Sequence, residues 1–361
     1  MGWIRPSKSL ISSLVFFIKK KDGSLWLVQD YWALNAITVK NKYPLPLISK
    51  LINKLQGAKY FTKLDVQWGF NNVQMKDGDE WKAAFQTNQG LYEPLVMFFG
   101  LTNSPATIQT MMDRIFKDLI SEGVVMVYLD DILIFTKTLE EHRNIVWQVM
   151  ELLWQHNLSL KLEKCEFEKL SVEYLGVIIS HNSVKMDPIK VAGVAEWPVP
   201  SNRKEVQSFL GFTNFYQRFI EGFSYIACPL FDLTQADSMF CWSLEEQMAF
   251  DNLQDKIVSA PILTLPNNSR PYHVEADSSD FATGAVLSQQ CTEDGKWHPV
   301  AFLSKSLSLL GNSPTGLPNP RTWLSILSGC IPHLTQSSIT TYISNYNPCL
   351  VLVSTHNCHG P

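Results

Sequence analysis

Two adjacent acids, Asp130 and Asp131, lie between two apolar runs rich in β-branched residues within positions 124–136. Runs of this length and composition are typical of buried strands, and the two acids fall where a hairpin would turn. Asp-Asp also suits an ordinary tight turn, which is the first interpretation of this stretch. The second is that the carboxylates stand at the end of a buried sheet and bind a divalent metal. The rest of the chain distinguishes between the two.

A third acid, Asp65, ends another predicted strand, residues 59–66. If the two strands are neighbours in one sheet, Asp65 and Asp130 emerge side by side, and like charges held that close require a cation. Magnesium prefers hard oxygen ligands and combines one or two carboxylates with substrate phosphates. Two such ions would activate a 3′-hydroxyl and stabilise the leaving pyrophosphate. The pattern therefore predicts nucleotidyl transfer on a nucleic-acid template.

The periodicity of the first 183 residues predicts an α+β sheet with helices on one face. Strands 14–20 and 25–30 are joined at Asp22-Gly23, a good hairpin signal. A helix that Ser104 caps and Pro105 opens should run to Gly123. Further elements are expected as a helix at 47–56, extended segments near 70–76 and 81–87, and a helix at about 139–156. Helices at 188–196, 202–219 and 243–259 precede strand character at 272–290.

Composition sets outer limits. A chain of 361 residues with 45% hydrophobic residues can form two or three soluble domains. The apolar run 10–18 contains two serines and is too short to span a bilayer or serve as a signal peptide. Seven cysteines without a C-x-x-C pair indicate a reduced intracellular setting and argue against a zinc finger.

The charge distribution is uneven. The net charge is −4, yet the first 64 residues carry eleven basic and two acidic side chains, a local net charge of +9. A basic surface of this kind suits phosphate contacts, and a merely solvated lysine face is the alternative.

The box Tyr128-Leu129-Asp130-Asp131 resembles the polymerase box of reverse transcriptases. The flanking residues resemble those of gypsy-class long-terminal-repeat retrotransposons. The similarity covers roughly residues 2–308, and the segments that carry it include 2–9, 19–24, 43–47, 61–66, 99–107, 164–167, 174–176 and 208–212. This ordered series makes the turn-only interpretation of Asp130-Asp131 untenable.

The resemblance implies a right-hand polymerase with fingers, palm and thumb or connection, followed by a truncated ribonuclease H-like α/β segment. The implied limits are 1–183 for fingers and palm, with an N-terminus that looks clipped, 184–265 for a helical thumb or connection, and 266–308 for the start of the ribonuclease H-like domain. Residues 309–361 would be a disordered or out-of-frame tail.

The resemblance also implies residue roles. The palm triad would be Asp65, Asp130 and Asp131, with the Val66 carbonyl as a further metal ligand for two Mg²⁺, or Mn²⁺ in their place. The remaining implied roles are nucleotide binding by Lys20, Phe70, Phe99 and Gly100, a primer grip at Leu175 and Gly176, and a ribonuclease H carboxylate at Asp277. For Phe70 and the other aromatics, ordinary core packing is the alternative.

The implied partners are an RNA template, a DNA primer, deoxynucleoside triphosphates and other segments of a Pol polyprotein, with no membrane contact. The implied location is intracellular, in the cytoplasm, a virus-like particle or the nucleus.

Several positions depart from the family pattern. Trp26 stands where relatives usually place an arginine that pairs with the nucleotide phosphates, and an indole offers only one neutral donor. Tryptophan or glutamine also replaces frequent arginines at Trp32, Trp147, Trp154, Gln67, Gln74, Gln86 and Gln89. A cytosine-to-thymine transition in a CG-containing arginine codon produces these changes. They suggest a second function class, a decayed element copy that at most binds nucleic acid.

The tail lacks acids altogether. Residues 309–361 contain no Asp, Glu or Lys, so no counterpart completes a ribonuclease H site with Asp277. One carboxylate cannot hold two metals, and the sequence therefore predicts no ribonuclease H activity.

Overall fold

The apolar runs on either side of Asp130-Asp131 are strands β7 (Val125–Tyr128) and β8 (Asp131–Thr136), paired as an antiparallel hairpin. The computed structural model describes residues 2–19, 23, 25–236, 238–267, 269–278, 282–291, 294–306, 339–343 and 351–355. The chain divides into two compact units, Met1–Leu47 with Ala58–Val172, and Ile48–Gly57 with Glu173–Pro361. The domain limits drawn from the sequence stay a prediction.

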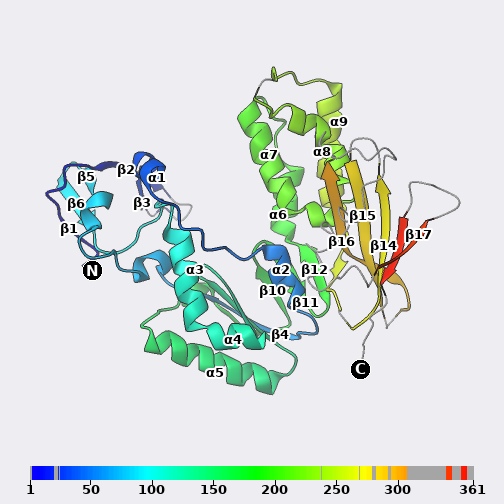
Figure 1. Cartoon of the computed structure of the whole chain (residues 1–361), viewed down its shortest axis with the longest axis horizontal. Coiled ribbons are helices and arrows are strands. Elements are labelled where there is room, and N and C mark those ends of the chain that lie inside the picture. Colours follow the sequence, from blue (N-terminus) through cyan, green and yellow to red (C-terminus); the bar gives the residue numbers. More distant parts are fainter. Residues whose placement is uncertain are drawn as a thin grey trace. The chain divides into compact units, whose positions relative to one another are not determined.

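The first unit contains two sheets (Figure 1). One has the strand order β1-β6-β5-β2-β3 and comprises β1 (Ile4–Pro6), β6 (Gly90–Pro94), β5 (Phe85–Thr87), β2 (Ser13–Lys19) and β3 (Leu25–Gln29). The other has the order β7-β8-β4-β9 and adds β4 (Tyr60–Asp65) and β9 (Glu166–Lys169). Its helices are α1 (Trp32–Ile37), α3 (Ser104–Ile115), α4 (Lys117–Glu122) and α5 (Leu139–Gln155), with short turns η1 (Gly69–Asn72), η2 (Glu80–Ala83) and η3 (Leu162–Lys164).

Alternation along β7 and β8 determines where the helices pack. The buried side chains of Val125, Val127, Ile132 and Ile134 share one core with residues of α3, α4 and α5. Because side chains of a strand alternate between its faces, that face of the sheet carries the helices. Figure 1 shows α3, α4 and α5 alongside the sheet of β4. The predicted α+β arrangement is confirmed for this unit.

The second unit contains both helices and two sheets. Its helices are α2 (Ile48–Asn53), α6 (Pro188–Ala195), α7 (Arg203–Phe215), η4 (Gln217–Phe219), α8 (Phe223–Asp232) and α9 (Leu244–Val258). One sheet is β10 (Ser171–Tyr174), β11 (Val177–Ser180), β12 (Ser183–Met186) and β13 (Leu263–Thr264), in that order. The other has the order β16-β15-β14-β18-β17 and comprises β16 (Trp297–Ser306), β15 (Ala282–Gln290), β14 (Tyr272–Ser278), β18 (Val351–Thr355) and β17 (Ile339–Ile343).

Several predicted elements are confirmed. The β2–β3 hairpin pairs Lys19 with Leu25, and Gly23 in the connection has a positive φ of +82°, which glycine adopts readily. The strand predicted at 59–66 is β4, and the helix predicted at 139–156 is α5.

Other local predictions are confirmed only in part or are wrong. The segments 70–76 and 81–87 each begin in a 3-10 turn, η1 or η2, and become extended only afterwards, at the isolated bridge of Gln74 with Val96 and in strand β5. The helix predicted from Ser104 to Gly123 breaks at Phe116, and its cap residue is Asn103, while the Ser104 hydroxyl donates to the Phe98 carbonyl. Helix α8, which contains Pro229, lies between the predicted helices 202–219 and 243–259, where no helix was expected.

The tail also differs from its prediction. Two segments for which no element was expected, β17 and β18, are strands, and β18 pairs with β14. Both segments are rich in Val, Ile and Thr, residues that favour strands.

Candidate active site

The two acids stand at the turn of the β7–β8 hairpin, and a third lies directly opposite. Tyr128 pairs with Asp131, so Leu129 and Asp130 form the two-residue turn. Asp65, the last residue of β4, is the cross-strand partner of Asp131. The Val66 amide donates to the Asp130 carbonyl at 2.9 Å, which ties β4 to the turn. The sheet order β7-β8-β4 therefore brings all three carboxylates to one edge.

The turn is held in an unfavourable backbone conformation. Leu129 has φ of +55°, which costs a side-chain-bearing residue about 1–2 kcal/mol. The buried Gln109 of α3 accepts the Leu129 amide at 2.9 Å and donates to the Val127 carbonyl at 3.2 Å. Burial of Ile132 beyond the turn contributes about 1.5–3 kcal/mol, enough to offset the strain. The helix α3 thus fixes the position of Asp130.

The site carries a concentrated negative charge. Burial raises the pKa of Asp131 to about 6, with further raising by Asp130 and Asp65. Burial also raises the pKa of Asp130, and Asp65 adds to the effect. Charges that raise one another's pKa in a half-buried setting are the arrangement that a divalent cation relieves. The donor set of hard carboxylate oxygens fits Mg²⁺ or Mn²⁺.

Lys164 already supplies one positive charge. Its Nζ lies 2.8 Å from Oδ2 of Asp65, and this bond raises the pKa of Lys164. The Lys161 amide also donates to the Asp65 carbonyl, so the segment after α5 is anchored on β4. Among the residues that the structure describes, the carboxylate oxygens of Asp65, Asp130 and Asp131 do not all lie within 4.8 Å of one another. A cation binding there competes with Lys164 for Asp65.

Gly69 and Phe70 follow the Asp65 strand and border the site. A Cβ on Gly69 would lie 2.8 Å from Cβ of Asp130, so only glycine lets this backbone pass so close. Phe70 is 7% exposed and packs against Phe99, which is 42% exposed, with ring centroids 4.6 Å apart and ring planes tilted by 57°. The core packing considered for Phe70 is thus present, in a cluster against which Leu129 of the turn also packs.

Tyr31 and Asn35 of the same unit fix the position of Gly100. Gly100 has φ of +93°, and a Cβ there would meet the Tyr31 ring at 3.4 Å. Asn35 donates to the Gly100 carbonyl at 2.7 Å and accepts the Thr102 amide at 2.8 Å. Gly100 and Phe99 are consequently fixed as one loop next to α3.

Leu175 and Gly176 form a strained turn between β10 and β11. Both have positive φ, +49° and +80°. The Tyr216 hydroxyl donates to the Gly176 carbonyl at 3.0 Å, and a Cβ on Gly176 would lie 2.9 Å from that hydroxyl. Burial raises the pKa of Tyr216 to about 12, which keeps the hydroxyl a donor. The two residues belong to the second unit, whereas the three acids belong to the first.

Three residues singled out in the sequence are described in part or not at all. Lys20 lies outside the described residues, and of Trp26 and Asp277 only the backbone is described, within β3 and β14.

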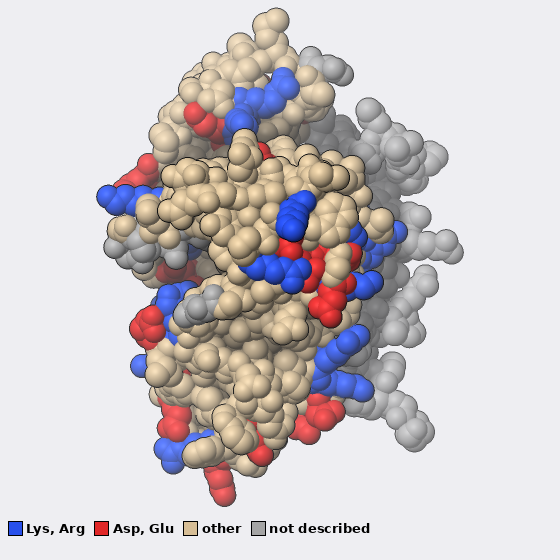
Figure 2. Space-filling model, turned by 90° about the vertical axis from the view of Figure 1, so that its left-hand side faces the viewer, with Lys and Arg blue, Asp and Glu red and all other residues tan. Residues whose placement is uncertain are grey.

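The charged surface is mixed where it can be seen. Figure 2 shows Lys and Arg interspersed with Asp and Glu on a largely uncharged face. One basic residue of the N-terminal segment, Arg5, is engaged internally, since its Nε lies 2.6 Å from Glu93 and its Nη2 lies 3.5 Å from Glu80. The Arg5 guanidinium is therefore paired with acids of its own unit.

The comparisons with known families match this geometry. Residues 18–179 match the model described as reverse transcriptase (RNA-dependent DNA polymerase). The chain carries a reverse transcriptase domain. Residues 242–311 match the model of the RNase H-like domain found in reverse transcriptase. All three acids, Gly69, Gln109 and Lys164 fall within the reverse transcriptase match.

Curated relatives are transposon polyproteins. The retrovirus-related Pol polyprotein from transposon 297 of Drosophila melanogaster is 38% identical over 313 residues, which span 85% of this chain and 29% of that protein. The transposon Tf2-3 polyprotein of Schizosaccharomyces pombe is 38% identical over 307 residues, which span 85% of this chain and 23% of that protein. The chain spans less than a third of the length of either relative.

Solved structures agree on the fold. The foamy viral protease-reverse transcriptase in complex with dsDNA has a TM-score of 0.77 at 23% identity, covering 93% of this chain and 70% of that one. The same kind of enzyme in complex with an RNA/DNA hybrid has a TM-score of 0.73 at 23% identity, covering 85% and 41%. The predicted right-hand polymerase fold followed by a ribonuclease H-like segment is confirmed.

Three residues that contact the candidate site were not predicted from the sequence. Gln109 is a polar residue on the apolar face of α3, beside Ile108 and Met112. A polar side chain among buried apolar ones indicates a specific hydrogen-bonding role, and this was the signal in the sequence. Lys164 lies in a segment already recognised as similar to the family. Gly69 gave no local signal, because its closeness to Asp130 arises only from the tertiary fold.

Proposed function

We propose that this chain is the polymerase segment of a long-terminal-repeat retrotransposon Pol polyprotein, of the gypsy class, and that it synthesises DNA on an RNA or DNA template. The observation that carries the proposal is the meeting of Asp65, Asp130 and Asp131 at one sheet edge inside the reverse transcriptase domain. The relatives described as Pol polyproteins support the element class.

In the proposed reaction, the primer 3′-oxygen attacks the α-phosphorus of a deoxynucleoside triphosphate. The new phosphodiester bond forms as the bond to the β-phosphate oxygen breaks and pyrophosphate leaves. Two Mg²⁺ ions held by Asp65, Asp130, Asp131 and the Val66 carbonyl, when bound, would activate the 3′-hydroxyl and stabilise the leaving group. Mn²⁺ has the same preference for oxygen ligands and is the alternative.

The chain's own residues hold the reactants. Phe99 and Gly100 would contact the incoming nucleotide and template, and Phe70, wedged beside Phe99, would exclude a ribose 2′-hydroxyl. Lys20 would contact the triphosphate. Leu175 and Gly176, fixed by Tyr216, would grip the primer. Nucleic-acid partners are supported by the structural relatives, which are described in complex with an RNA/DNA hybrid and with double-stranded DNA.

The remaining proposals concern the rest of the protein. We propose that Asp277 alone does not support ribonuclease H activity in this chain, and that the protein acts inside the cell. No helix among the described residues is long and apolar enough to cross a membrane.

Primer extension tests the polymerase proposal. The purified chain should extend a DNA primer on an RNA template in the presence of Mg²⁺, and Asp130→Asn should abolish the product. Asp118→Asn, which removes an exposed acid of α4, is the control and should retain synthesis. Equal background from the wild-type chain and Asp130→Asn would contradict the proposal.

A further inference from the structure

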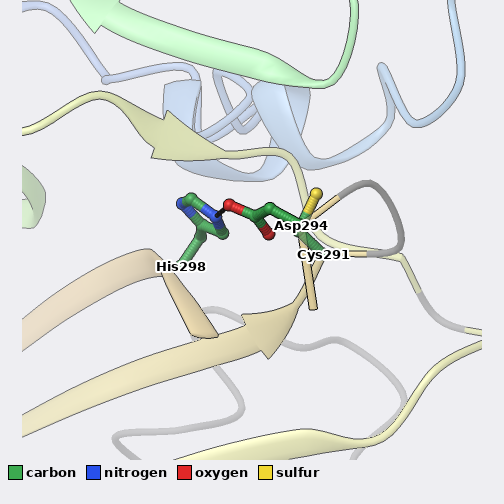
Figure 3. A group of neighbouring side chains, drawn as sticks. All are labelled: Cys291, Asp294 and His298. Atoms are coloured by element: carbon green, nitrogen blue, oxygen red, sulfur yellow. Dashed lines mark hydrogen bonds and ion pairs between the residues drawn. The ribbon is translucent and has the colours of Figure 1, made fainter. Parts of the chain in front are cut away.

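The turn between β15 and β16 brings together three side chains of different chemistry. The thiol of Cys291, the carboxylate of Asp294 and the imidazole of His298 each offer one ligand atom, and these atoms all lie within 4.8 Å of one another. Figure 3 shows Asp294 between the other two, with its carboxylate bonded to the imidazole. The Nε2–Oδ2 distance is 2.8 Å. No part of the proposed polymerase reaction uses this cluster.

The backbone of the turn holds the cluster in place. The Cys291 amide donates to the Lys296 carbonyl at 2.8 Å, and the Gly295 amide donates to the Cys291 carbonyl at 3.1 Å. Gly295 has φ of +66°, which allows the chain to reverse. The Lys296 amide donates to Oδ1 of Asp294 at 3.0 Å, which leaves Oδ2 directed at His298. The ligand atoms are therefore positioned by a closed loop and by the start of β16.

The donor set selects the kind of metal. Thiolate, imidazole and carboxylate together are the ligands of Zn²⁺, with bond lengths of about 2.0–2.3 Å, whereas Mg²⁺ and Ca²⁺ avoid sulfur. In a tetrahedral site of that size, ligand atoms lie about 3.3–3.8 Å apart, so small side-chain rotations close the observed cluster. Cys291 and His298 are half-buried, Cys291 is not in a disulfide, and Asp294 is exposed. Solvent access leaves room for a water as the fourth ligand.

We propose that Cys291, Asp294 and His298 form a Zn²⁺ site that pins the β15–β16 turn of the ribonuclease H-like domain. The spacing C-x2-D-x3-H places all three protein ligands in one hairpin, and a water would complete the tetrahedron. The site is separate from the three polymerase acids, which come from the other compact unit. Its role is structural, since the metal would hold the end of β15, the strand that pairs with β14.

Cobalt substitution gives a signal that carboxylates alone cannot produce. The full chain, stripped of metal and kept reduced, is titrated with Co²⁺, and a thiolate-to-cobalt charge-transfer band is expected with one equivalent. Addition of Zn²⁺ should remove the band by displacement. Cys291→Ser should abolish it, and His298→Ala should weaken Co²⁺ binding at least about 10-fold, the lower bound for loss of a supporting contact.

Cys165→Ser is the matched control, because Cys165 is also half-buried and lies beside the polymerase acid Asp65. This variant should keep the band. A band that persists in Cys291→Ser, or that disappears in Cys165→Ser, overturns the proposal, as does the absence of any band. Zn²⁺ should also raise the melting temperature of the wild-type chain and leave that of Cys291→Ser unchanged, a readout that is independent of polymerase activity.

Discussion

Asp131 illustrates how the function of a site opposes the stability of the fold. Its pKa is raised to about 6 because burial and two neighbouring acids disfavour the ionised form. The folded chain therefore binds the proton more tightly than the unfolded chain. The stabilisation from this proton is complete below the ordinary pKa of 3.8 and is lost as the pH rises through about 6. At neutral pH without metal, ionised Asp131 destabilises the fold.

Asp131→Asn should accordingly stabilise the metal-free protein. With the shift discounted for partial solvent access, we expect a gain on the order of 1–2 kcal/mol at pH 8 in EDTA, which shrinks as the pH falls toward 5. Thermal denaturation across this pH range measures it, with Asp118→Asn as the control for removal of a charge. A melting temperature at or below that of the wild type at pH 8 would show that the acids are not mutually destabilising.

Lys164 is the second residue whose effect depends on metal. Its ion pair with Asp65 is about half-exposed on the lysine side, so the free energy it contributes is small, about 0.2–1 kcal/mol. If a cation must displace Lys164 from Asp65, Lys164→Gln should bind Mn²⁺ about two- to five-fold more tightly. Calorimetric titration measures this. Lys161→Gln, which removes a neighbouring lysine paired with Glu163, should leave the affinity unchanged.

At the scale of elements, the catalytic hairpin depends on a close approach by the chain that follows β4. A Cβ on Gly69 would meet Cβ of Asp130 at 2.8 Å and Cδ1 of Ile108 at 3.0 Å. Both neighbours are fixed, one by the turn and one by the core, so the added methyl group must displace Asp130. Overpacking of this kind costs about 1–3 kcal/mol.

Gly69→Ala should therefore fold but lose most of its primer-extension rate, because the carboxylate moves. Gly193→Ala is the control, since a Cβ there meets nothing within 4 Å and α6 gains about 0.5–1 kcal/mol from a better helix former. The rate of the control should equal that of the wild type. A Gly69→Ala rate equal to the wild type would refute the link between this glycine and Asp130.

Elements with strong periodicity were predictable from the sequence, and contacts between distant elements were not. The β7–β8 hairpin and α5 follow from their apolar patterns alone. The break at Phe116 and the helical Pro229 depend on packing, which overrides local propensity. In the candidate site, the sequence singled out Asp65, Asp130 and Asp131, and it placed Asp130 beside Asp65. The cross-strand partner of Asp65 is instead Asp131, because β8 and not β7 is the neighbour of β4.

At the scale of the whole molecule, substituted arginine positions distinguish an intact polymerase from a decayed copy. Trp32, Trp147 and Trp154 are 86%, 76% and 80% exposed, where an indole gains little from burial. Such positions suit a charged side chain, and the exposure supports the hypothesis that tryptophan replaced arginine there. The three acids that we propose hold the metal ions, Asp65, Asp130 and Asp131, are by contrast all present. Under that proposal, the metal ligands are better preserved than the positive charges expected around them.

Trp26→Arg tests this view of the molecule. Trp26 lies in β3, paired with Ile18 of β2. The resemblance to reverse transcriptases implies an arginine for the nucleotide phosphates at this position. A restored charge-assisted bond contributes about 1.5–3 kcal/mol, so the KM for deoxynucleoside triphosphates should fall about 10- to 150-fold. Trp154→Arg on α5 is the control and should leave KM unchanged. Equal KM values for Trp26→Arg and the wild-type chain would mean that the tryptophan is not what limits nucleotide binding.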